Sequence, residues 1–523
     1  MLTDIPSSIE ILVIGGGPAG TYAASALARE GFSVVLLEKD HFPRYHIGES
    51  MLPSCRAFLR FIGAEEKVAD HGFTVKVGAA VKLNQHKREG YTDFISPDPN
   101  KAAWNVVRSE FDEILLRHAA ESGARVYEGV QVASIEFSSG ADDKRPVSAE
   151  WTSDRGGCGK IRFNWLVDAS GRAGIMSTKY LKNRKFNSAL KNIAFWGYWT
   201  GAGIYGAGTK RQNAPWFEAL TDETGWAWFI PLHNGTVSVG IVLNEEASRT
   251  KKANLQGPNQ NKAHYLAQLE LAPGVIHFLK NAILASEIKS AGDYSYHATQ
   301  HAGPNFRIAG DAGAFIDPFF SSGVHLAFAG GLSAAASIAA SIRKHCTEEE
   351  ASLFHTVKIG ESYTRFLLVV LSTYRQINAQ AAPVLSDIDE DNFDRAFEFL
   401  KPVIQGRADT DKTLTEETLQ RTMDFCEHAM APTSPEMHAA VAARLDASLL
   451  APESPIIGTG EVAALVGNDE EAKQVLWRVN ARKAVGEMLD WEAGFENEIS
   501  SGFSVVLERT KLGLRRTEVG SDA

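Results

Sequence analysis

The sequence has few cysteines, and their spacing excludes the usual cysteine-based scaffolds. The chain of 523 residues has only four, and they are Cys55, Cys158, Cys346 and Cys426. No two of them form a CxxC pair, which argues against a disulfide framework and against a zinc cluster. His297 and His301 are four residues apart but lack the intervening glutamate of a zinc-protease helix. We therefore expect no metal.

Basic residues are fewer than acidic residues. Lysine and arginine total 53 against 64 aspartates and glutamates, so the formal net charge at pH 7 is -11, and there is no long basic run. Binding to nucleic acid or to an anionic membrane surface requires clustered basic residues. We expect a small-molecule substrate, with neither nucleic acid nor a membrane as a partner.

A secretory leader and a membrane-spanning run are not visible either. The first residues carry Asp4 and Glu10 and lack a basic start followed by an apolar core. The most apolar helical stretch, residues 324–342, is rich in small residues that suit close helix packing better than contact with lipid. The sequence thus favours a cytoplasmic protein whose length and 44% hydrophobic content allow a large core in two or three subdomains.

The N-terminus contains a strong nucleotide-binding pattern. Residues 10–20 run from a short apolar segment into a glycine-rich turn, an alanine-rich helical stretch follows, and residues 32–38 read as a second buried strand ending in an acid. In such a βαβ unit, Gly15 permits the tight turn, Gly17 lets the backbone approach a pyrophosphate and Gly20 allows close helix packing. Glu38 falls where the ribose acceptor belongs, about 20 residues on. The alternative is a glycine-rich turn in another kind of α/β protein.

Two later motifs indicate a family. Phe315, Pro318, Ser321 and Gly323 form FxxPxxSxG, and residues 226–231 form WxWxIP. These resemble the halide-site and tryptophan motifs of flavin-dependent halogenases, and His46-Ile-Gly-Glu-Ser50 resembles the segment beside the flavin in the same family. The resemblance covers most of residues 8–345. Residues 43–53 and 317–323 look like the fungal phenol halogenases, which chlorinate polyketide phenols such as resorcylic acid lactones and orsellinic acid derivatives.

The resemblance implies an α/β fold in which an FAD-binding Rossmann-like domain of the flavin monooxygenase type is joined to a second, mostly antiparallel β-sheet and a helical C-terminal region. The expected parts are residues 8–185 (first part of the FAD-binding domain, with inserted strands around 72–100), 186–295 (substrate-domain sheet), 296–345 (last part of the FAD-binding domain, with the halide site) and 346–523 (helical C-terminal region).

FAD is the cofactor that the resemblance implies. The residues expected to bind it are Gly15, Gly16, Gly17, Ala19, Gly20, Glu38, Glu49, Ser50, Arg108, Asp311 and Val324. Reduced FAD and dioxygen are expected to form a C4a-hydroperoxide, whose terminal oxygen chloride or bromide attacks. The sequence shows no second dinucleotide fingerprint, so we expect a separate flavin reductase to supply FADH2.

The halide site is expected where an apolar helix begins. Backbone N–H groups near a helix start bind anions without a full positive charge, which favours Ser322 and Gly323 as the halide site. Alternatively, the serines only cap that helix. Trp226, Trp228 and Pro231 are expected to separate flavin from substrate, although the tryptophans could equally be core aromatics of the second sheet.

Lys76 lies where the resemblance implies a catalytic lysine. Its ammonium could donate a hydrogen bond to hypochlorous acid, or form a chloramine if burial deprotonates it. Alternation with period two places Lys76 and Lys82 on one face of a continuous strand, so an exposed polar face is the competing interpretation.

The substrate prediction depends on one departure from a related motif. Tryptophan halogenases carry a glutamate before the serine of the halide motif, and this chain has Phe320. A phenol supplies its own ring activation and does not need that carboxylate. Phe319 and Phe320 are therefore expected to line an aromatic substrate pocket. The sequence does not decide whether the phenol is free or tethered to a carrier protein.

Two other functions compete with halogenation. A single-component aromatic hydroxylase shares the fold, but its usual Gly-Asp-Ala-Ala-His is replaced by residues 310–314, Gly-Asp-Ala-Gly-Ala. The second alternative is an inactive flavin-binding protein that serves in an assembly. The retention of Lys76, Ser321 and Gly323 argues against it.

Overall fold

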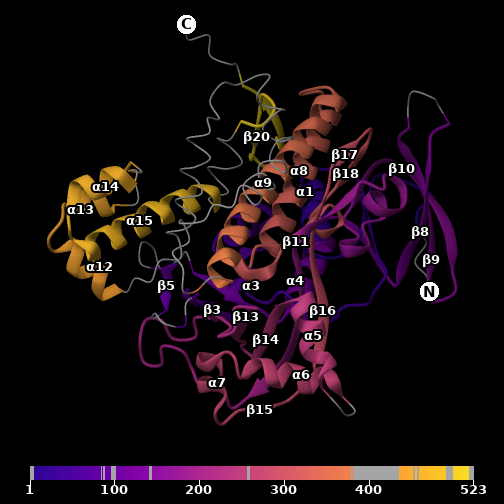
Figure 1. Ribbon diagram of the computed structural model, residues 1–523. Helices are drawn as coiled ribbons and strands as arrows, with labels where there is room; N and C mark the ends of the chain where they lie inside the picture. The colour runs from indigo at the N-terminus through magenta and orange to yellow at the C-terminus, as the bar shows by residue number, and fades with distance from the viewer. Residues whose placement is uncertain are drawn as a thin grey trace, which may run out of the picture.

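The structure is a computed structural model that describes residues 5–517 apart from 84, 86–88, 96–101, 140–143, 256–258, 379, 381–434, 452–453, 456, 458 and 490–498. Its described part is built around two large sheets, with helices between and around them (Figure 1).

The first sheet has eight strands, in the order β17-β18-β10-β1-β2-β7 with β8 and β9 attached through β10. They are β1 (Ser8–Ile14), β2 (Val34–Glu38), β7 (Arg125–Glu128), β8 (Val130–Phe137), β9 (Pro146–Ser153), β10 (Cys158–Asp168), β17 (Ala302–Gly303) and β18 (Phe306–Ile308). Strand β1 pairs in parallel with both β2 and β10, and β10 pairs in parallel with β18. Helix α1 (Pro18–Arg29) connects the parallel strands β1 and β2, which gives the predicted βαβ unit.

The second sheet has nine strands, in the order β19-β16-β11-β14-β13-β12-β4-β5 with β15 paired to β11. They are β4 (Gly78–Lys82), β5 (Gly90–Asp93), β11 (Arg184–Thr200), β12 (Trp216–Ala219), β13 (Gly225–Pro231), β14 (Thr236–Asn244), β15 (Ile283–Leu284), β16 (Lys289–Ala298) and β19 (Ala314–Phe315). Its central pairs are antiparallel, which confirms the predicted sheet type.

Four helices pack on or beside the first sheet. They are α1 (Pro18–Arg29), α2 (Cys55–Ile62), α4 (Arg108–Glu121) and α8 (Gly323–Ile342). Helix α8 alone among the described helices is long and apolar enough to span a membrane by length and composition, yet 89% of its most apolar window is buried. Its glycines bring it close to α1, since a Cβ on Gly331 would lie 2.7 Å from the Ala19 carbonyl oxygen. Helix α8 is therefore a core helix.

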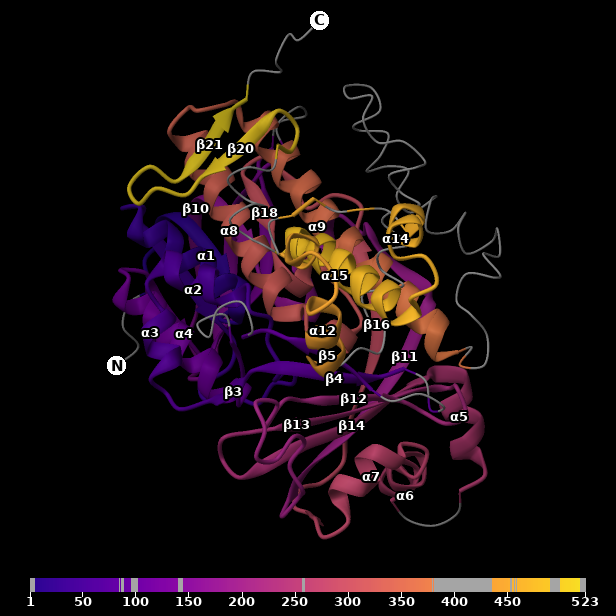
Figure 2. The ribbon, with the colours of Figure 1, turned by 90° about the vertical axis from the view of Figure 1, so that its left-hand side faces the viewer.

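Of the remaining described helices, α3 packs beside α2 and α4, α5 to α7 cover the second sheet, and the others form the C-terminal region. They are α3 (Glu65–Ala69), α5 (Glu245–Ala253), α6 (Gln260–Leu269), α7 (Pro273–Leu279), α9 (Glu348–Ile377), α12 (Pro435–Ala442), α13 (Ala447–Leu450), α14 (Thr459–Val466) and α15 (Glu470–Leu489). Helices α6 and α7 pack on the outer face of the second sheet, at the bottom of Figure 2. The expected helical C-terminal region also contains a hairpin, β20 (Phe503–Val506) and β21 (Gly513–Arg516), whose apolar side chains join the core around α8.

One prediction about the segment containing Lys76 is wrong. Residues 72–83 do not form a continuous strand, because β3 (Thr74–Lys76) pairs with β6 (Ala103–Asn105) while β4 begins at Gly78 in the second sheet. Lys76 is 2% exposed, whereas Lys82 is half-buried. The two lysines therefore do not share an exposed polar face.

Candidate active site

A single cavity of about 680 Å³ extends from the glycine-rich turn of the first sheet to the tryptophans of the second. Twelve of the residues predicted to bind the flavin or the halide, or to form the tryptophan wall, line it, and they are Gly15, Gly17, Ala19, Glu38, Glu49, Ser50, Arg108, Trp226, Trp228, Asp311, Gly323 and Val324. The fold thus brings the motifs of both sheets to one site.

Seven other predicted site residues do not line the cavity, and they are Gly16, Gly20, Lys76, Pro231, Phe319, Phe320 and Ser322. Gly20 has a packing role, because a Cβ there would lie 1.9 Å from the Gly15 carbonyl oxygen. A Cβ on Gly16 would lie about 3 Å from the side chains of Leu116 and Glu38. These two glycines let the turn and helix α1 pack closely.

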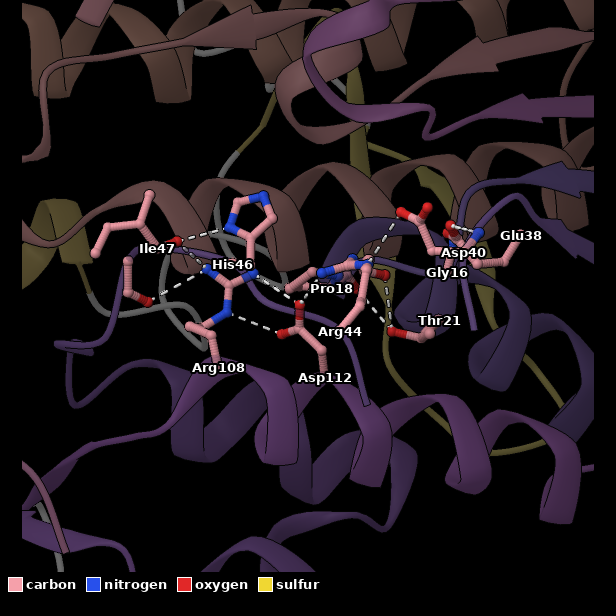
Figure 3. Close-up of polar contacts among 12 residues, drawn as sticks. Gly16, Pro18, Thr21, Glu38, Asp40, Arg44, His46, Ile47, Arg108 and Asp112 are labelled. Atoms are coloured by element: carbon pink, nitrogen blue, oxygen red, sulfur yellow. Dashed lines mark hydrogen bonds and ion pairs between the residues drawn. The ribbon is translucent and has the colours of Figure 1, made fainter. Parts of the chain in front are cut away.

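The nucleotide end of the cavity is open at Gly17. Gly17 caps the start of α1 without a side-chain hydrogen bond, and a Cβ there would meet only Arg44 Nη2, at 3.5 Å. The Gly16 N–H donates to Glu38 Oε2 at 2.5 Å, and the Asp40 N–H donates to Glu38 Oε1 at 2.9 Å (Figure 3). The carboxylate thereby fixes the turn, and the free N–H groups at the helix start fit a pyrophosphate. These residues fit FAD.

Two arginines share one aspartate beside this turn (Figure 3). Arg108 Nε and Nη2 donate to the two oxygens of Asp112 at 2.8 and 3.0 Å, and Arg108 Nη1 donates to the Ile47 carbonyl at 2.8 Å. Arg44 Nη1 donates to Asp112 Oδ2 at 3.1 Å. Burial acts to raise the pKa of Asp112, but Arg108 and then Arg44 outweigh it and lower that pKa. The ionised trio carries one net positive charge, which suits an anionic cofactor.

Glu49 lies at the end of a hydrogen-bonded chain that the sequence did not predict. Tyr198 Oη donates to Glu49 Oε1 at 2.6 Å, the hydroxyls of Tyr198 and Tyr45 are 3.0 Å apart, and Trp196 Nε1 donates to Tyr45 Oη at 2.7 Å. Glu49 Oε2 is buried and has no hydrogen-bond partner within the described residues. Burial raises the pKa of Glu49 to about 7, against the opposing effects of its hydrogen bonds and Arg108. A carboxyl group that titrates near neutrality therefore lines the cavity.

Asp311 follows the turn after β18. It is half-buried and lines the cavity. Burial raises its pKa to about 6, while Arg108 acts in the opposite direction. The Asp311 carbonyl accepts a hydrogen bond from Tyr296 Oη at 2.7 Å, which holds the turn against the second sheet.

The halide motif forms a tight turn before α8. Asp317 Oδ1 accepts a hydrogen bond from the Phe319 N–H at 3.0 Å, and Ser321 has a left-handed φ of 55°. Ser322 makes no side-chain capping bond, and its Oγ is buried without a partner in the part of the chain that the structure describes. Ser322 is thus the N-cap residue of α8, but its hydroxyl does not cap the helix. A Cβ on Gly323 would meet nothing within 4 Å, so the N–H end of this 20-residue helix has open space.

Helix α9 buttresses the tryptophans. The rings of Trp226 and Trp228 are 5.8 Å apart. Trp226 Nε1 donates to Tyr374 Oη at 2.8 Å, and Tyr374 Oη donates to Asp317 Oδ2 at 2.6 Å. Phe319 packs edge to face on Trp226 at 4.9 Å. The tryptophan motif and the halide motif are thus joined through Tyr374, which no sequence motif marked.

Lys76 lies in a buried position next to the segment that lines the cavity. Its Nζ donates to the Met51 carbonyl at 2.8 Å and lies 5.3 Å from the centre of the Phe94 ring. Burial lowers the pKa of Lys76 to about 7, and Cys55 acts weakly in the opposite direction. Asn105, opposite Thr74 in the β3 and β6 pair, is buried, and neither atom of its amide has a partner among the described residues.

This chain is similar to known flavin-dependent halogenases over nearly its whole length. Residues 8–349 match the FAD binding domain family. The flavin-dependent halogenase armH1 of Armillaria mellea is 61% identical, over 99% of this chain and 100% of that protein. The flavin-dependent halogenase rdc2 of Metacordyceps chlamydosporia is 49% identical, over 98% and 99%.

Solved structures show the same relationship. The myxobacterial chondrochloren halogenase CndH superposes with a TM-score of 0.66 at 28% identity, covering 78% of this chain and 92% of that one. The flavin-dependent halogenase CmlS superposes with a TM-score of 0.67 at 25% identity, covering 82% and 73%.

Proposed function

This chain belongs to the flavin-dependent halogenases and uses FAD, a halide and dioxygen; from that premise we propose that it chlorinates an electron-rich phenol of polyketide origin. The observation that carries the substrate class is the aromatic surface next to the halide motif. Phe319 contacts Trp226, and Phe320 contacts Phe319 at 5.1 Å, where a carboxylate would serve an unactivated ring.

The phenol is proposed to bind where Phe217 of β12 and Trp226 of β13 line the cavity, and Phe319 of the halide motif packs against both rings without lining the cavity itself. Trp226, Phe319 and Phe217 form one aromatic cluster, with Phe217 and Phe319 centroids 6.0 Å apart. A phenol ring can stack or pack edge to face on such a surface, at a gain of about 0.5–1.5 kcal/mol for each well-formed aromatic pair. A phenol brings its own hydroxyl for ring activation and leaves no buried charge unpaired in this apolar site.

Several residues are proposed to hold FAD. The N–H groups at the start of α1 and the Arg44 guanidinium would bind the pyrophosphate, Glu38 the ribose and Asp311 the ribityl chain. When bound, reduced FAD with dioxygen supplies the oxidising equivalent that turns halide into an electrophile. Trp226 and Trp228 would separate this chemistry from the substrate ring.

The halide is proposed to bind at the start of α8. The Gly323 N–H and the partnerless Ser322 hydroxyl can both donate to an anion, and the helix dipole favours negative charge there. Chloride binding would therefore satisfy a buried hydroxyl that has no partner among the described residues, which removes a cost of about 1–3 kcal/mol.

Lys76 is proposed to act as a hydrogen-bond donor to hypochlorous acid. Its Nζ can donate more than one hydrogen bond, and the Met51 carbonyl takes only one of them. Burial has already lowered its pKa to about 7, so both charge states are accessible near neutrality. The ammonium would raise the electrophilicity of the chlorine, while the neutral amine would permit the chloramine route.

We propose that a separate flavin reductase delivers FADH2, that the protein acts in the cytoplasm, and that the phenol is either free or carried on a carrier protein. The high identity to halogenases disfavours the hydroxylase alternative. The inactive assembly protein makes a different prediction, because it would bind flavin and form no halogenated product.

The decisive experiment is a mass-spectrometric assay with FAD, a flavin reductase, NADH, air, chloride and a panel of resorcylic and orsellinic phenols. We expect a product with the chlorine isotope doublet that disappears when chloride or the reductase is omitted. A hydroxylated product formed with NAD(P)H alone would contradict the proposal. Chlorination of tryptophan in place of every phenol would contradict the substrate class.

A further inference from the structure

Three side chains far apart in the sequence meet at the boundary between the two sheets. His71 lies between α3 and β3, Glu110 lies in the first turn of α4, and His233 lies in the turn between β13 and β14. His71 Nε2 is 2.7 Å from Glu110 Oε2, and His233 Nε2 is 3.1 Å from the same oxygen. The three potential ligand atoms all lie within 4.8 Å of one another.

From this geometry we propose that His71, Glu110 and His233 form a binding site for a divalent transition metal, with Zn²⁺ as the probe. Two imidazoles and one carboxylate are a common ligand set for zinc and for other divalent transition metals. Ligands of tetrahedral zinc lie about 3.3 Å apart, given metal–nitrogen distances of about 2.0–2.1 Å. The observed separations need only small side-chain movements to reach that arrangement.

The surroundings hold the ligands in place and leave a path for an ion. Phe73 is buried, and its ring centre lies 4.3 Å from that of His71 and 5.2 Å from that of His233. The side chains of His71, Glu110 and His233 are 33%, 36% and 22% exposed, so water can reach the site and complete the coordination. The rigid aromatic contact lowers the entropy cost of ordering the two imidazoles.

The expected zinc affinity depends on the Nδ1 atoms of the two histidines, which would not bind the metal. A metal-bound histidine usually donates its other N–H to an acceptor, and loss of that contact weakens binding about 10–100-fold. His233 Nδ1 is buried and has no partner in the described ranges, so His233 lacks such an acceptor. We therefore expect a dissociation constant on the order of micromolar, weaker than in a closed structural zinc site.

A metal at this site would link two segments that lie close in sequence to proposed active-site residues. His233 follows Pro231 by two residues on the strand of Trp226, and His71 precedes Lys76 by five residues. The ion would clamp the β13 and β14 turn to the first-sheet side of the cavity. Because the folded chain alone assembles the three ligands, metal binding would also stabilise the folded state.

The test uses tag-free full-length protein, incubated with Zn²⁺, dialysed and measured for metal content, with Co²⁺ absorption as the report on coordination. We expect about one zinc per chain, a Co²⁺ spectrum of low-symmetry coordination and a melting temperature raised by about 2 °C or more. His233→Ala and Glu110→Gln should each weaken binding at least tenfold. His41→Ala is the matched control, since His41 lies outside the cluster and pairs with Asp154 at 2.7 Å.

Equal zinc retention by the wild-type protein and His233→Ala would overturn the site, as would equal loss in His41→Ala. If zinc did not bind to the wild-type protein, the three side chains would be a hydrogen-bonded cluster only. FAD titration and circular dichroism of each variant establish that a loss of metal is not a loss of fold.

Discussion

At the scale of single residues, the site depends on polar groups that burial has made chemically responsive. Lys76 and Glu49 belong to opposite charge types, yet burial moves the pKa of each to about 7. Desolvation disfavours the charged form of both groups, so it lowers the pKa of the amine and raises that of the acid. Groups whose pKa values burial shifts toward neutrality are a frequent feature of catalytic sites.

Replacing Lys76 with methionine should abolish chlorination while FAD still binds. Methionine keeps much of the volume but removes the donor, and loss of a positioned donor of this kind costs about 100-fold or more in rate. The measurements are the chlorinated product by mass spectrometry and FAD affinity by fluorescence titration. Lys82→Met is the control. Chlorination at near the wild-type rate in Lys76→Met would remove Lys76 from the mechanism.

The pH dependence of chlorination should identify the active charge state of Lys76. With a pKa of about 7, the ammonium is lost as pH rises through neutrality. If Lys76 acts as the ammonium donor, the single-turnover rate with prereduced FAD should fall between pH 6 and 8. A rate that rises over the same range would favour the chloramine route, and Lys76→Arg would then be inactive at every pH.

Replacing Lys76 with methionine should also raise the free energy of unfolding, most strongly at low pH. The folded-state pKa of Lys76 is about 7, below the ordinary value of 10.5, so the unfolded chain binds more protons between these values. The cost of burying the charge is fully present below pH 7 and falls as pH rises. We expect Lys76→Met to gain on the order of 3 kcal/mol over wild type at pH 6 and less at pH 9, measured by denaturant unfolding. An equal gain at both pH values would contradict the assigned burial cost.

At the scale of elements, two glycines near the start of α1 have different roles, one in FAD binding and the other in folding. Gly17 has an ordinary extended backbone and open space, whereas a Cβ on Gly20 would collide with the Gly15 carbonyl. Gly17→Val should therefore lower FAD affinity at least about tenfold with little change in the stability of the apoprotein. Gly20→Val should instead lower stability by about 3 kcal/mol or more. FAD titration and apoprotein unfolding of both variants test the distinction.

Helix α9 contributes a hydroxyl that joins two motifs. Tyr374→Phe deprives Trp226 Nε1 of its acceptor and removes one donor to Asp317. We expect a loss of about 1–3 kcal/mol in stability and a raised KM for the phenol, with FAD affinity unchanged. The exposed Leu353 on the same helix gives the control variant Leu353→Ala. An unchanged KM would show that Tyr374 does not position the tryptophan wall.

At the scale of the whole molecule, one cavity extends from the first sheet to the second. We therefore expect product formation to require the halide, the reduced flavin and the substrate together. Bromide should replace chloride, because it is easier to oxidise, and brominated product should form at least as fast when each halide is supplied alone. Omission of the reductase should stop both reactions. The readout is the isotope pattern of the product, and a bromide-inert enzyme would count against oxidation of the halide.

The sequence by itself determined the features in which neighbouring residues act together. The βαβ unit, the glycine-rich turn and the halide motif are each encoded within a short segment, because turn geometry and strand or helix periodicity are local properties. The antiparallel second sheet was predictable from alternation for the same reason. The burial of Lys76 was not, since alternation predicted one strand where the chain divides between two sheets.

Only the tertiary structure decided which distant residues meet. Tyr374 reaches Trp226 across 148 positions, Tyr198 reaches Glu49 across 149, and His71 lies beside a glutamate 39 positions away. No spacing rule links such residues, because their contact depends on how α4, α9 and the β13 and β14 turn pack. Burial likewise belongs to the folded state, and it is burial that moves the pKa values of Lys76 and Glu49 toward neutrality.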